Sequence, residues 1–160
     1  MCIRDSFNGA VDNASGTAGL LELARMFGRA PRTERSVVMI SFTGEESGLL
    51  GSEYYAVNPV YPLAKTVGGF NMDSMNVYGR VTGLGVTGYG QSDFDERLAA
   101  AIQPQGRTLV PDHENAAGTY YRSDHFPLAK RGVPMAYAGS RGDFRDAPVA
   151  EREAARAEYG

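Results

Sequence analysis

Apolar residues along the chain follow two patterns, one with the period of a helix and one typical of buried strands. Within residues 16–27, Leu20, Leu23, Ala24 and Phe27 recur at helical spacing, which predicts an amphipathic helix. Residues 37–42 (VVMISF) are almost all β-branched or apolar. A run of this kind predicts a strand that is covered on both faces, as in a parallel or mixed sheet.

The same patterns predict further elements along the rest of the chain. Strands are expected at 66–72, 81–87, 107–110 and 135–138, and helices at 49–57, 92–102, 126–131 and 147–158. Because strands and helices alternate, the sequence predicts one α/β domain over residues 7–160, with a mixed, mainly parallel central sheet flanked by helices on both faces. Residues 1–6 (MCIRDS) match neither pattern, and we interpret them as foreign to the domain or misread.

Composition and charge narrow the class of protein. Of the 160 residues, 42% are hydrophobic and 22% are charged, as in ordinary globular domains, and the net charge of -3 gives no reason to expect a nucleic acid partner. Cys2 is the only cysteine, so neither an internal disulfide nor a thiolate metal site can form. No apolar run approaches the ~20 residues of a membrane-spanning helix.

Carboxylates gather at the predicted ends of strands. Asp12 lies in a Gly-rich loop before the first helix, Glu45 and Glu46 follow the strand at 37–42, and Asp73 follows the strand at 66–72. Ligands of open α/β sheets bind beyond the carboxyl ends of strands, so we expect these acids to converge. Crowded carboxylates repel one another, and a pair of divalent cations would relieve that repulsion. One glutamate could then bind metal while its neighbour acts as general base, and the residues alone do not say which.

The tripeptide Ser123-Asp124-His125 contains the residue types of a serine-hydrolase triad. Consecutive side chains point in different directions, whereas a triad is assembled from distant positions, and the G-x-S-x-G motif is missing. We therefore interpret this segment as a turn whose Asp or His supports the wall of a site.

Three other features have a structural and a functional interpretation. The segment Gly83–Gly88 fits G-x-G-x-x-G, but its glycines lie within a predicted strand, which favours a Gly-rich strand packed against a close neighbour. Tyr120 and Tyr121 either pack in the core or place a phenol hydroxyl where it stabilises an oxyanion. His113 is interpreted as a solvent-exposed loop residue.

Four segments occur in an order that points to a known family: NGAVDNASGTAGLLELAR, FTGEESGLLGSEYY, NMDSMN and YRSDHFPLAKRGVPMAY. Together they resemble the co-catalytic zinc aminopeptidases of the bacterial leucyl aminopeptidase and aminopeptidase Y type. The resemblance covers residues 7 to 139 and implies the zinc-exopeptidase fold, which is similar to that of the phosphorylases and hydrolases. It also implies a peptide substrate with a free N-terminus and an extracellular or periplasmic location.

The resemblance implies a role for each acid. Asp12 would bridge two zinc ions, Glu46 and Asp73 would each bind one of them, and Glu45 would act as general base. Tyr120 is a weaker candidate for catalysis. Four further residues are candidates for support of the site: Asn13, Ser123, Asp124 and His125.

Histidines mark the departure from the family. The family completes each zinc site with a histidine, one upstream in a His-x-Asp segment and one downstream, and neither His113 nor His125 occupies such a position. We therefore expect a fragment, cut at both ends, that binds zinc weakly and is nearly inactive. Glutaminyl cyclisation, carboxypeptidase-type hydrolysis and a non-catalytic binding role stay open, although the intact Glu45-Glu46 pair argues against the last.

Overall fold

The computed structural model describes residues 9–111 and 118–146, together with residues 151, 153, 154 and 157. Residues 1–6, His113 and most of the helix predicted at 147–158 lie outside these. The helices are α1 (Ala14–Arg29), α2 (Leu50–Val57), α3 (Phe94–Ile102) and α4 (Phe126–Ala129), with 3-10 turns η1 (Leu63–Lys65), η2 (Gln103–Gln105) and η4 (Thr119–Tyr121). The strands are β1 (Gly69–Asn71), β2 (Val81–Thr87), β3 (Thr108–Pro111) and β4 (Met135–Phe144).

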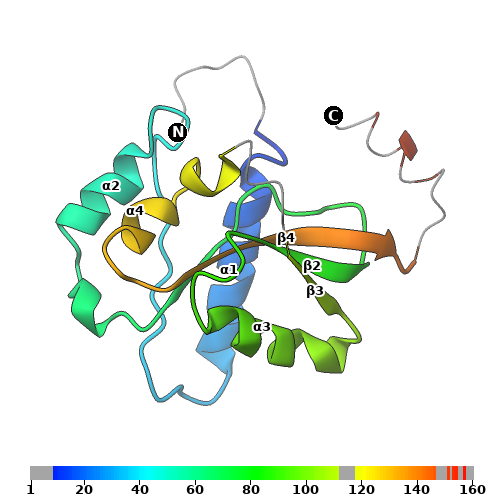
Figure 1. The fold of residues 1–160 in the computed structure, drawn as a ribbon, viewed down its shortest axis with the longest axis horizontal. Coiled ribbons are helices and arrows are strands. Elements are labelled where there is room, and N and C mark those ends of the chain that lie inside the picture. The colour runs from blue at the N-terminus through cyan, green and yellow to red at the C-terminus, as the bar shows by residue number, and fades with distance from the viewer. Residues whose placement is uncertain (1–8, 112–117, 147–150, 152, 155–156, 158–160) are drawn as a thin grey trace.

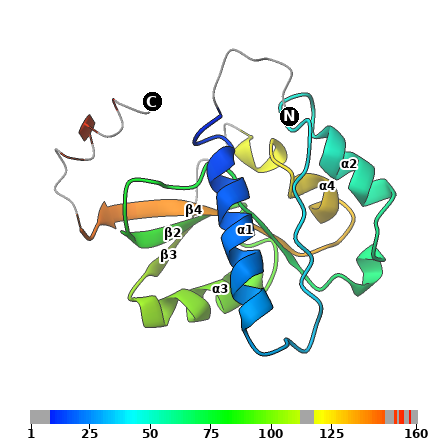
Figure 2. The ribbon, with the colours of Figure 1, turned by 180° about the vertical axis from the view of Figure 1, so that it is seen from behind.

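The four strands form one mixed sheet in the order β1-β4-β2-β3. β1 is parallel to β4 and β2 is parallel to β3, whereas β2 and β4 are antiparallel. α3 lies on one face of the sheet and α1 crosses the other, while α2 and α4 pack together beside the β1 end (Figures 1 and 2). The predicted α/β class, with helices on both faces of a mixed sheet, is confirmed.

Two apolar clusters hold these layers together. The first lies between α3 and the sheet, where Val86 and Ala138 of the strands meet Leu98 and Ile102 of the helix. The second joins α2, α4 and the start of β4, through Ala56, Leu128 and Val133. Burial of a large apolar side chain contributes roughly 1.5–3 kcal/mol. The two clusters therefore anchor the first half of the long strand β4, at Met135 and at Ala138.

The glycines of β2 serve packing, as the sequence predicted. A Cβ on Gly85 would lie 2.5 Å from Cγ of Arg141, and one on Gly83 would lie 3.0 Å from the Arg141 carbonyl oxygen. Real Cβ atoms essentially never approach another atom as closely as at Gly85, and the contact at Gly83 would be tighter than most. The G-x-G-x-x-G pattern thus reflects the close approach of β2 and β4 and not a strand-to-helix nucleotide loop.

The strand predicted at 37–42 is wrong. These residues have no strand structure, and the side chains of Val37 and Val38 are 48% and 46% exposed. An apolar run becomes a strand only when a neighbouring strand accepts its hydrogen bonds. Among the described residues the sheet ends at β1, and no strand pairs with 37–42.

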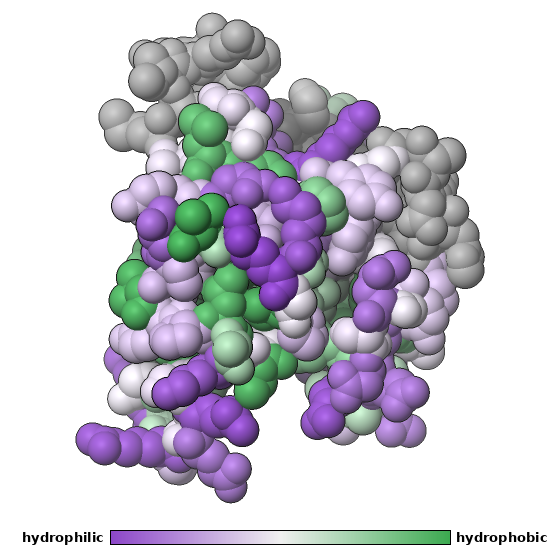
Figure 3. Space-filling view, turned by 60° about the vertical axis from the view of Figure 1, so that its left-hand side comes forward, coloured by the Kyte–Doolittle hydropathy of each residue, from purple (hydrophilic) through white to green (hydrophobic). Residues whose placement is uncertain are grey.

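Hydrophobic side chains also reach the surface elsewhere. Figure 3 shows green, apolar patches between polar side chains on the face that includes α2. Leu50 on α2 is 59% exposed, and Phe27 on α1 is 44% exposed. The apolar pattern of the sequence therefore overestimates how much of the chain is buried. None of the helices in the described part is long and apolar enough to cross a membrane.

Candidate active site

Five carboxylates from four separate loops form what we call the acidic cluster, which consists of Asp12, Glu45, Glu46, Asp73 and Asp124. Asp12 precedes α1, the two glutamates precede α2, Asp73 follows β1 and Asp124 precedes α4. Asn71, the last residue of β1, is in register with Tyr137 of β4, so the cluster lies at the carboxyl end of this parallel pair. Such an edge is where ligands bind in α/β sheets.

Asn13 fixes the loop that carries Asp12. Its side-chain oxygen caps α1 by accepting a hydrogen bond from the Gly16 amide at 2.9 Å, and its side-chain nitrogen donates to the Met72 carbonyl at 3.0 Å. A Cβ on Gly16 would collide with the Asn13 side chain and lie 2.5 Å from the Met72 oxygen. The start of α1 is therefore docked on the segment next to Asp73.

Ser15 directly precedes the helix predicted at 16–27, a position that is typical of an N-cap. The structure gives the cap to Asn13, and Ser15 instead bridges two loops. Its hydroxyl donates to the Val11 carbonyl at 2.5 Å and accepts from the Met75 amide at 2.9 Å. Serine before a predicted helix is a general capping signal, so the sequence could not separate the two roles.

A tight turn presents Glu45 and Glu46 at the entry to α2. Gly44 begins the turn with a positive φ of 68°, a conformation that favours glycine. The Gly51 amide donates to the Thr43 carbonyl at 2.8 Å, and a Cβ on Gly51 would lie 2.7 Å from both the Thr43 nitrogen and oxygen. These glycines let the helix close onto the turn and hold the two glutamates in place.

Asp73 is oriented by a buried serine. The Ser123 hydroxyl donates to Oδ2 of Asp73 at 2.7 Å and accepts from the side-chain amide of Asn71, also at 2.7 Å. Ser123 is only 3% exposed, so this hydrogen-bonded chain is shielded from solvent. One carboxylate oxygen of Asp73 is thereby fixed.

The acids are close enough to perturb one another. Burial, and then the charges of Asp73, Glu46, Asp124 and Asp12, raise the pKa of Glu45 to about 7. Burial likewise raises the pKa of Asp12, as do the charges of Asp73 and Glu46 and a hydrogen bond with Asp73. Like charges held in this way favour protonation, unless a cation compensates them.

The cluster fits a divalent cation in charge and in donor type, because oxygen ligands from Asp and Glu are among those that zinc accepts. Within residues 9–111, 118–146 and the four described residues near the C-terminus, no three His, Cys, Asp or Glu side chains are grouped as ligands of one ion. Within the described residues the cluster therefore supplies carboxylate oxygens, but no set of three ligands placed around one ion.

The tripeptide at 123–125 does not form a triad. Ser123 bonds to Asp73, whereas Asp124 accepts a hydrogen bond from the buried Ser52 hydroxyl at 2.6 Å. His125 is fully buried, and no group of residues 9–111 or 118–146 forms a hydrogen bond with either ring nitrogen. Burial lowers the pKa of His125 to about 4, so the imidazole is neutral at pH 7. The three side chains serve three different contacts, as the sequence interpretation expected.

Two tyrosines enclose His125, and only one of them is coupled to the acids. The rings of Tyr120 and Tyr137 lie 4.8 and 4.9 Å from the imidazole. Burial and the charges of Asp73 and Glu45 raise the pKa of Tyr137 to about 12. The pKa of Tyr120 is raised by burial and by Tyr121. Tyr137 is therefore the phenol next to the acidic cluster, and the sequence analysis missed it because it lies inside a run that indicates only a strand.

Comparison with known proteins gives consistent matches. The pattern of peptidase family M28 matches residues 3–158. Aminopeptidase YwaD from Bacillus subtilis is 39% identical over 132 residues, which is 80% of this chain and 28% of that protein. Leupeptin-inactivating enzyme 1 from Streptomyces exfoliatus is 32% identical over 139 residues, which is 85% of this chain and 30% of the relative.

Solved structures agree with the sequence comparison. The zinc aminopeptidase BSAP from Bacillus subtilis superposes with a TM-score of 0.67 at 29% identity, over 84% of this chain and 32% of that chain. An aminopeptidase from Aneurinibacillus sp. strain AM-1 gives a TM-score of 0.64 at 28% identity, over 82% and 31%. This chain spans about a third of the length of these proteins. It belongs to peptidase family M28.

Proposed function

We propose that the acidic cluster is the carboxylate part of the metal site of a zinc-dependent aminopeptidase. The single observation that supports this most is the convergence of five acids, which raises the pKa of Glu45 to about 7. A general base is most effective when its pKa lies near the working pH. Asp12 would be shared between two zinc ions, with Glu46 and Asp73 each holding one.

The chain's own residues account for several parts of such a reaction. Zinc, when bound, supplies a Lewis acid that polarises the peptide carbonyl and acidifies water. The Glu45 carboxylate accepts the proton of the attacking water and returns it to the leaving amine. Ser123 and Asn71 keep Asp73 oriented, at 2.7 Å for each contact. Tyr137 stays protonated at neutral pH, and its phenol is a hydrogen-bond donor beside the acids.

The ligand set also bears on how active the 160-residue chain is by itself. His125 packs between aromatic rings, and the described residues offer no other imidazole. Structural and catalytic zinc sites ordinarily use at least three protein ligands for each ion. We therefore propose that this chain binds zinc weakly and turns over slowly.

The test combines a zinc titration with hydrolysis of an aminoacyl p-nitroanilide by the purified chain. Turnover should be slow and zinc-dependent, and Glu45→Gln should lower it at least 100-fold, since a general base contributes about 10²–10⁴. Glu96→Gln, on the exposed side of α3, is the matched control and should not change turnover. Equal turnover in Glu45→Gln and Glu96→Gln would contradict the proposed base. Tight, stoichiometric zinc with fast turnover would contradict the weak site.

Carboxypeptidase activity is the second candidate, because a relative from Arabidopsis thaliana named probable glutamate carboxypeptidase LAMP1 is 32% identical over 126 residues. The two activities are separated by substrates that carry only one free terminus. An N-acetylated peptide with a free C-terminus would be cleaved by a carboxypeptidase, whereas a C-terminally amidated peptide with a free amino group would be cleaved by an aminopeptidase.

A further inference from the structure

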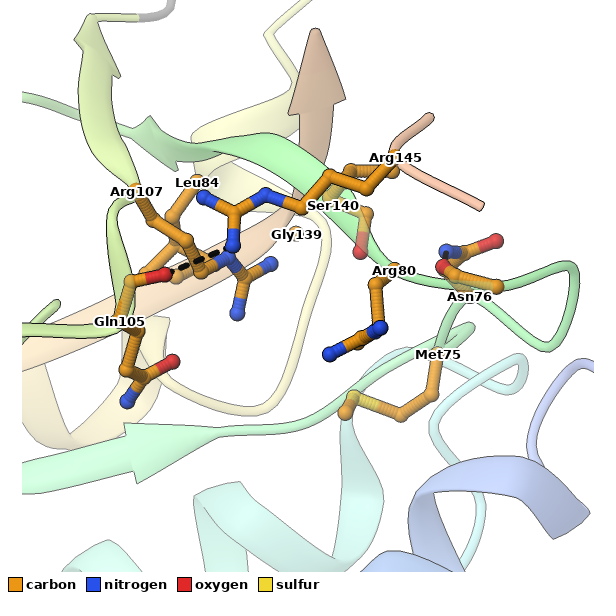
Figure 4. Close-up of a pocket in the computed structure, with 12 residues that line it drawn as sticks. Met75, Asn76, Arg80, Leu84, Gln105, Arg107, Gly139, Ser140 and Arg145 are labelled. Atoms are coloured by element: carbon orange, nitrogen blue, oxygen red, sulfur yellow. Dashed lines mark hydrogen bonds between the residues drawn. The ribbon is translucent and has the colours of Figure 1, made fainter. Parts of the chain in front are cut away.

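A second region of the molecule carries the opposite charge. A cavity of about 540 Å³ lies at the end of the sheet where β2 begins and β4 ends. Arg80, Arg107 and Arg145 line it, and among the residues that the structure describes no Asp or Glu does. Figure 4 shows the three guanidinium groups turned toward the middle of the cavity, from the segments before β2, before β3 and after β4.

The three guanidinium groups differ in how far the chain itself satisfies them. Arg80 forms a two-pronged ion pair with Asp146, at 2.7 and 2.8 Å, on the exposed rim. Arg145 donates to the carbonyl of Gln105 at 2.8 Å and to that of Gly106, and both of these acceptors are uncharged. Three positive charges thus face one carboxylate.

Arg107 is the least satisfied of the three. Its Nε is buried and, within the part of the chain that the structure describes, has no hydrogen-bond partner, while Nη2 forms a long hydrogen bond of 3.4 Å to the Gly83 carbonyl. A buried donor without a partner destabilises a protein, because it has lost its hydrogen bonds to water and gained none in return. An acceptor inside the cavity would remove this penalty.

The rest of the lining suits a small anion with some apolar surface. Leu84 and Val81 form an apolar wall, which lowers the local dielectric and strengthens charge–charge attraction. Ser140 and Asn76 add neutral polar groups. Guanidinium groups pair with planar oxyanions through two parallel hydrogen bonds, which makes carboxylate and phosphate the preferred partners.

We propose that this arginine-lined cavity binds a small oxyanion, held by Arg107 and Arg80 with Arg145 closing one side. The cavity shares the 72–80 loop with the acidic cluster, since Met75 lines it two residues beyond Asp73. The oxyanion has two sources that fit: a free ion such as phosphate, or a carboxylate on a peptide that also reaches the acidic cluster.

Isothermal titration of the metal-free chain with two probes tests the proposal and separates the sources. The probes are inorganic phosphate and the amidated dipeptide alanyl-glutamate, each at constant ionic strength in chloride. The uncharged amidated alanyl-glutamine is the control ligand. If only phosphate binds saturably, the ligand of the cavity is a free oxyanion. If the glutamate peptide binds and the glutamine peptide does not, the ligand is a carboxylate on a peptide.

Two variants place the binding in the cavity. Arg107→Gln should weaken it at least tenfold, because a hydrogen bond to a charged group contributes about 1.5–3 kcal/mol. Arg80→Gln removes an exposed ion pair and one cavity guanidinium, and should weaken it roughly threefold. The matched control is Arg97→Gln, which also removes an exposed ion pair, with Asp93 just before α3, but lies outside the cavity.

No saturable binding of either probe would overturn the proposal, as would equal binding in the wild-type chain, Arg80→Gln and Arg107→Gln. Far-UV circular dichroism of Arg107→Gln confirms that the variant is folded, and Arg80→Gln tests the site should it not be. Because zinc is left out, failure here leaves the proposed metal site untouched.

Discussion

The two ends of the 72–80 loop face opposite electrostatic environments. Asp73, near its start, lies among four other carboxylates, whereas Arg80, at its end, lies with two other arginines. The chain as a whole carries a net charge of only -3. The sequence thus has no strong overall charge, and the fold nevertheless separates its charges into two regions.

The two regions differ in how their charges are compensated. Arg80 has a carboxylate partner within the chain, and Arg145 has carbonyl acceptors. In the acidic cluster the nearest charges to Glu45 are other carboxylates, and its pKa rises. The acidic cluster therefore needs an external counter-ion more than the arginine-lined cavity does. We expect the ligand of the acidic cluster to bind more tightly than the ligand of the cavity.

The largest expected effect comes from Asp73→Asn. Removal of a charged ligand should lower zinc affinity roughly 100-fold, since even the supporting partners of metal ligands contribute 10–100-fold. Competition with a chromophoric chelator measures this affinity. Phosphate binding should stay unchanged, and Asp93→Asn, at the exposed position just before α3, is the control. Loss of both ligands together would show that the two regions are not independent.

Gly16→Ala should disrupt the acidic end selectively. An added methyl group would collide with Asn13 and with the Met72 carbonyl, and overpacking of this kind destabilises by about 1–3 kcal/mol. Gly19→Ala is the matched control on the same helix, because its nearest neighbour would be the Met72 sulfur at 3.8 Å. In urea unfolding, the free energy of unfolding should be clearly higher for Gly19→Ala than for Gly16→Ala. Equal stability of the two variants would contradict the docking of α1.

Ser123→Ala should affect zinc more than it affects folding. Without the 2.7 Å hydrogen bond Asp73 loses its fixed orientation, and zinc affinity should fall roughly tenfold. Ser52→Ala is a comparable change, since Ser52 is buried and donates to Asp124. Chelator competition on both variants shows whether the Asp73 contact is the more important one. A larger zinc effect in Ser52→Ala would contradict this.

The smallest expected effect is a stabilisation. The pKa of Glu45 is raised to about 7, so above pH 7 its charge weakens the metal-free fold, and this destabilisation disappears as the pH falls through 7 to the ordinary value of 4.5. Glu45→Gln should therefore stabilise the metal-free chain at pH 8 by about 1 kcal/mol, after allowance for solvent screening. Below pH 4.5 the variant and the wild type should have equal stability. A thermal melt at each pH measures the difference, and a variant less stable at pH 8 would contradict the crowding of carboxylates.

Local patterns predicted much of the fold. The 3.6-residue period identified α1 and α3, and the apolar run with internal glycines identified β2. The pattern failed at 37–42, because whether an apolar run becomes a strand depends on a hydrogen-bonding neighbour that no local feature specifies. The pattern also predicted that the last strand ends at 138, whereas β4 continues to Phe144. Residues 140–144 are strand because they pair with β2, and no local apolar pattern marks that pairing.

The pattern placed Asp12 before a helix and Asp73 after a strand, as the structure has them, whereas Glu45 and Glu46 were placed by a strand at 37–42 that the structure lacks. Their convergence is a property of α/β sheets in general. Tyr137 could not be predicted as a neighbour, since nothing in a strand pattern distinguishes a phenol that faces a site. The arginine cavity has no sequence signal either, because Arg80, Arg107 and Arg145 come from three distant loops.

The most direct test of the metal site is a zinc-soaked crystal of this chain measured at the zinc absorption edge. The account predicts anomalous density between Asp12 and Asp73 or Asp12 and Glu46, and none in the arginine-lined cavity. Density only at other residues, such as His113, with none at the acidic cluster, would contradict it.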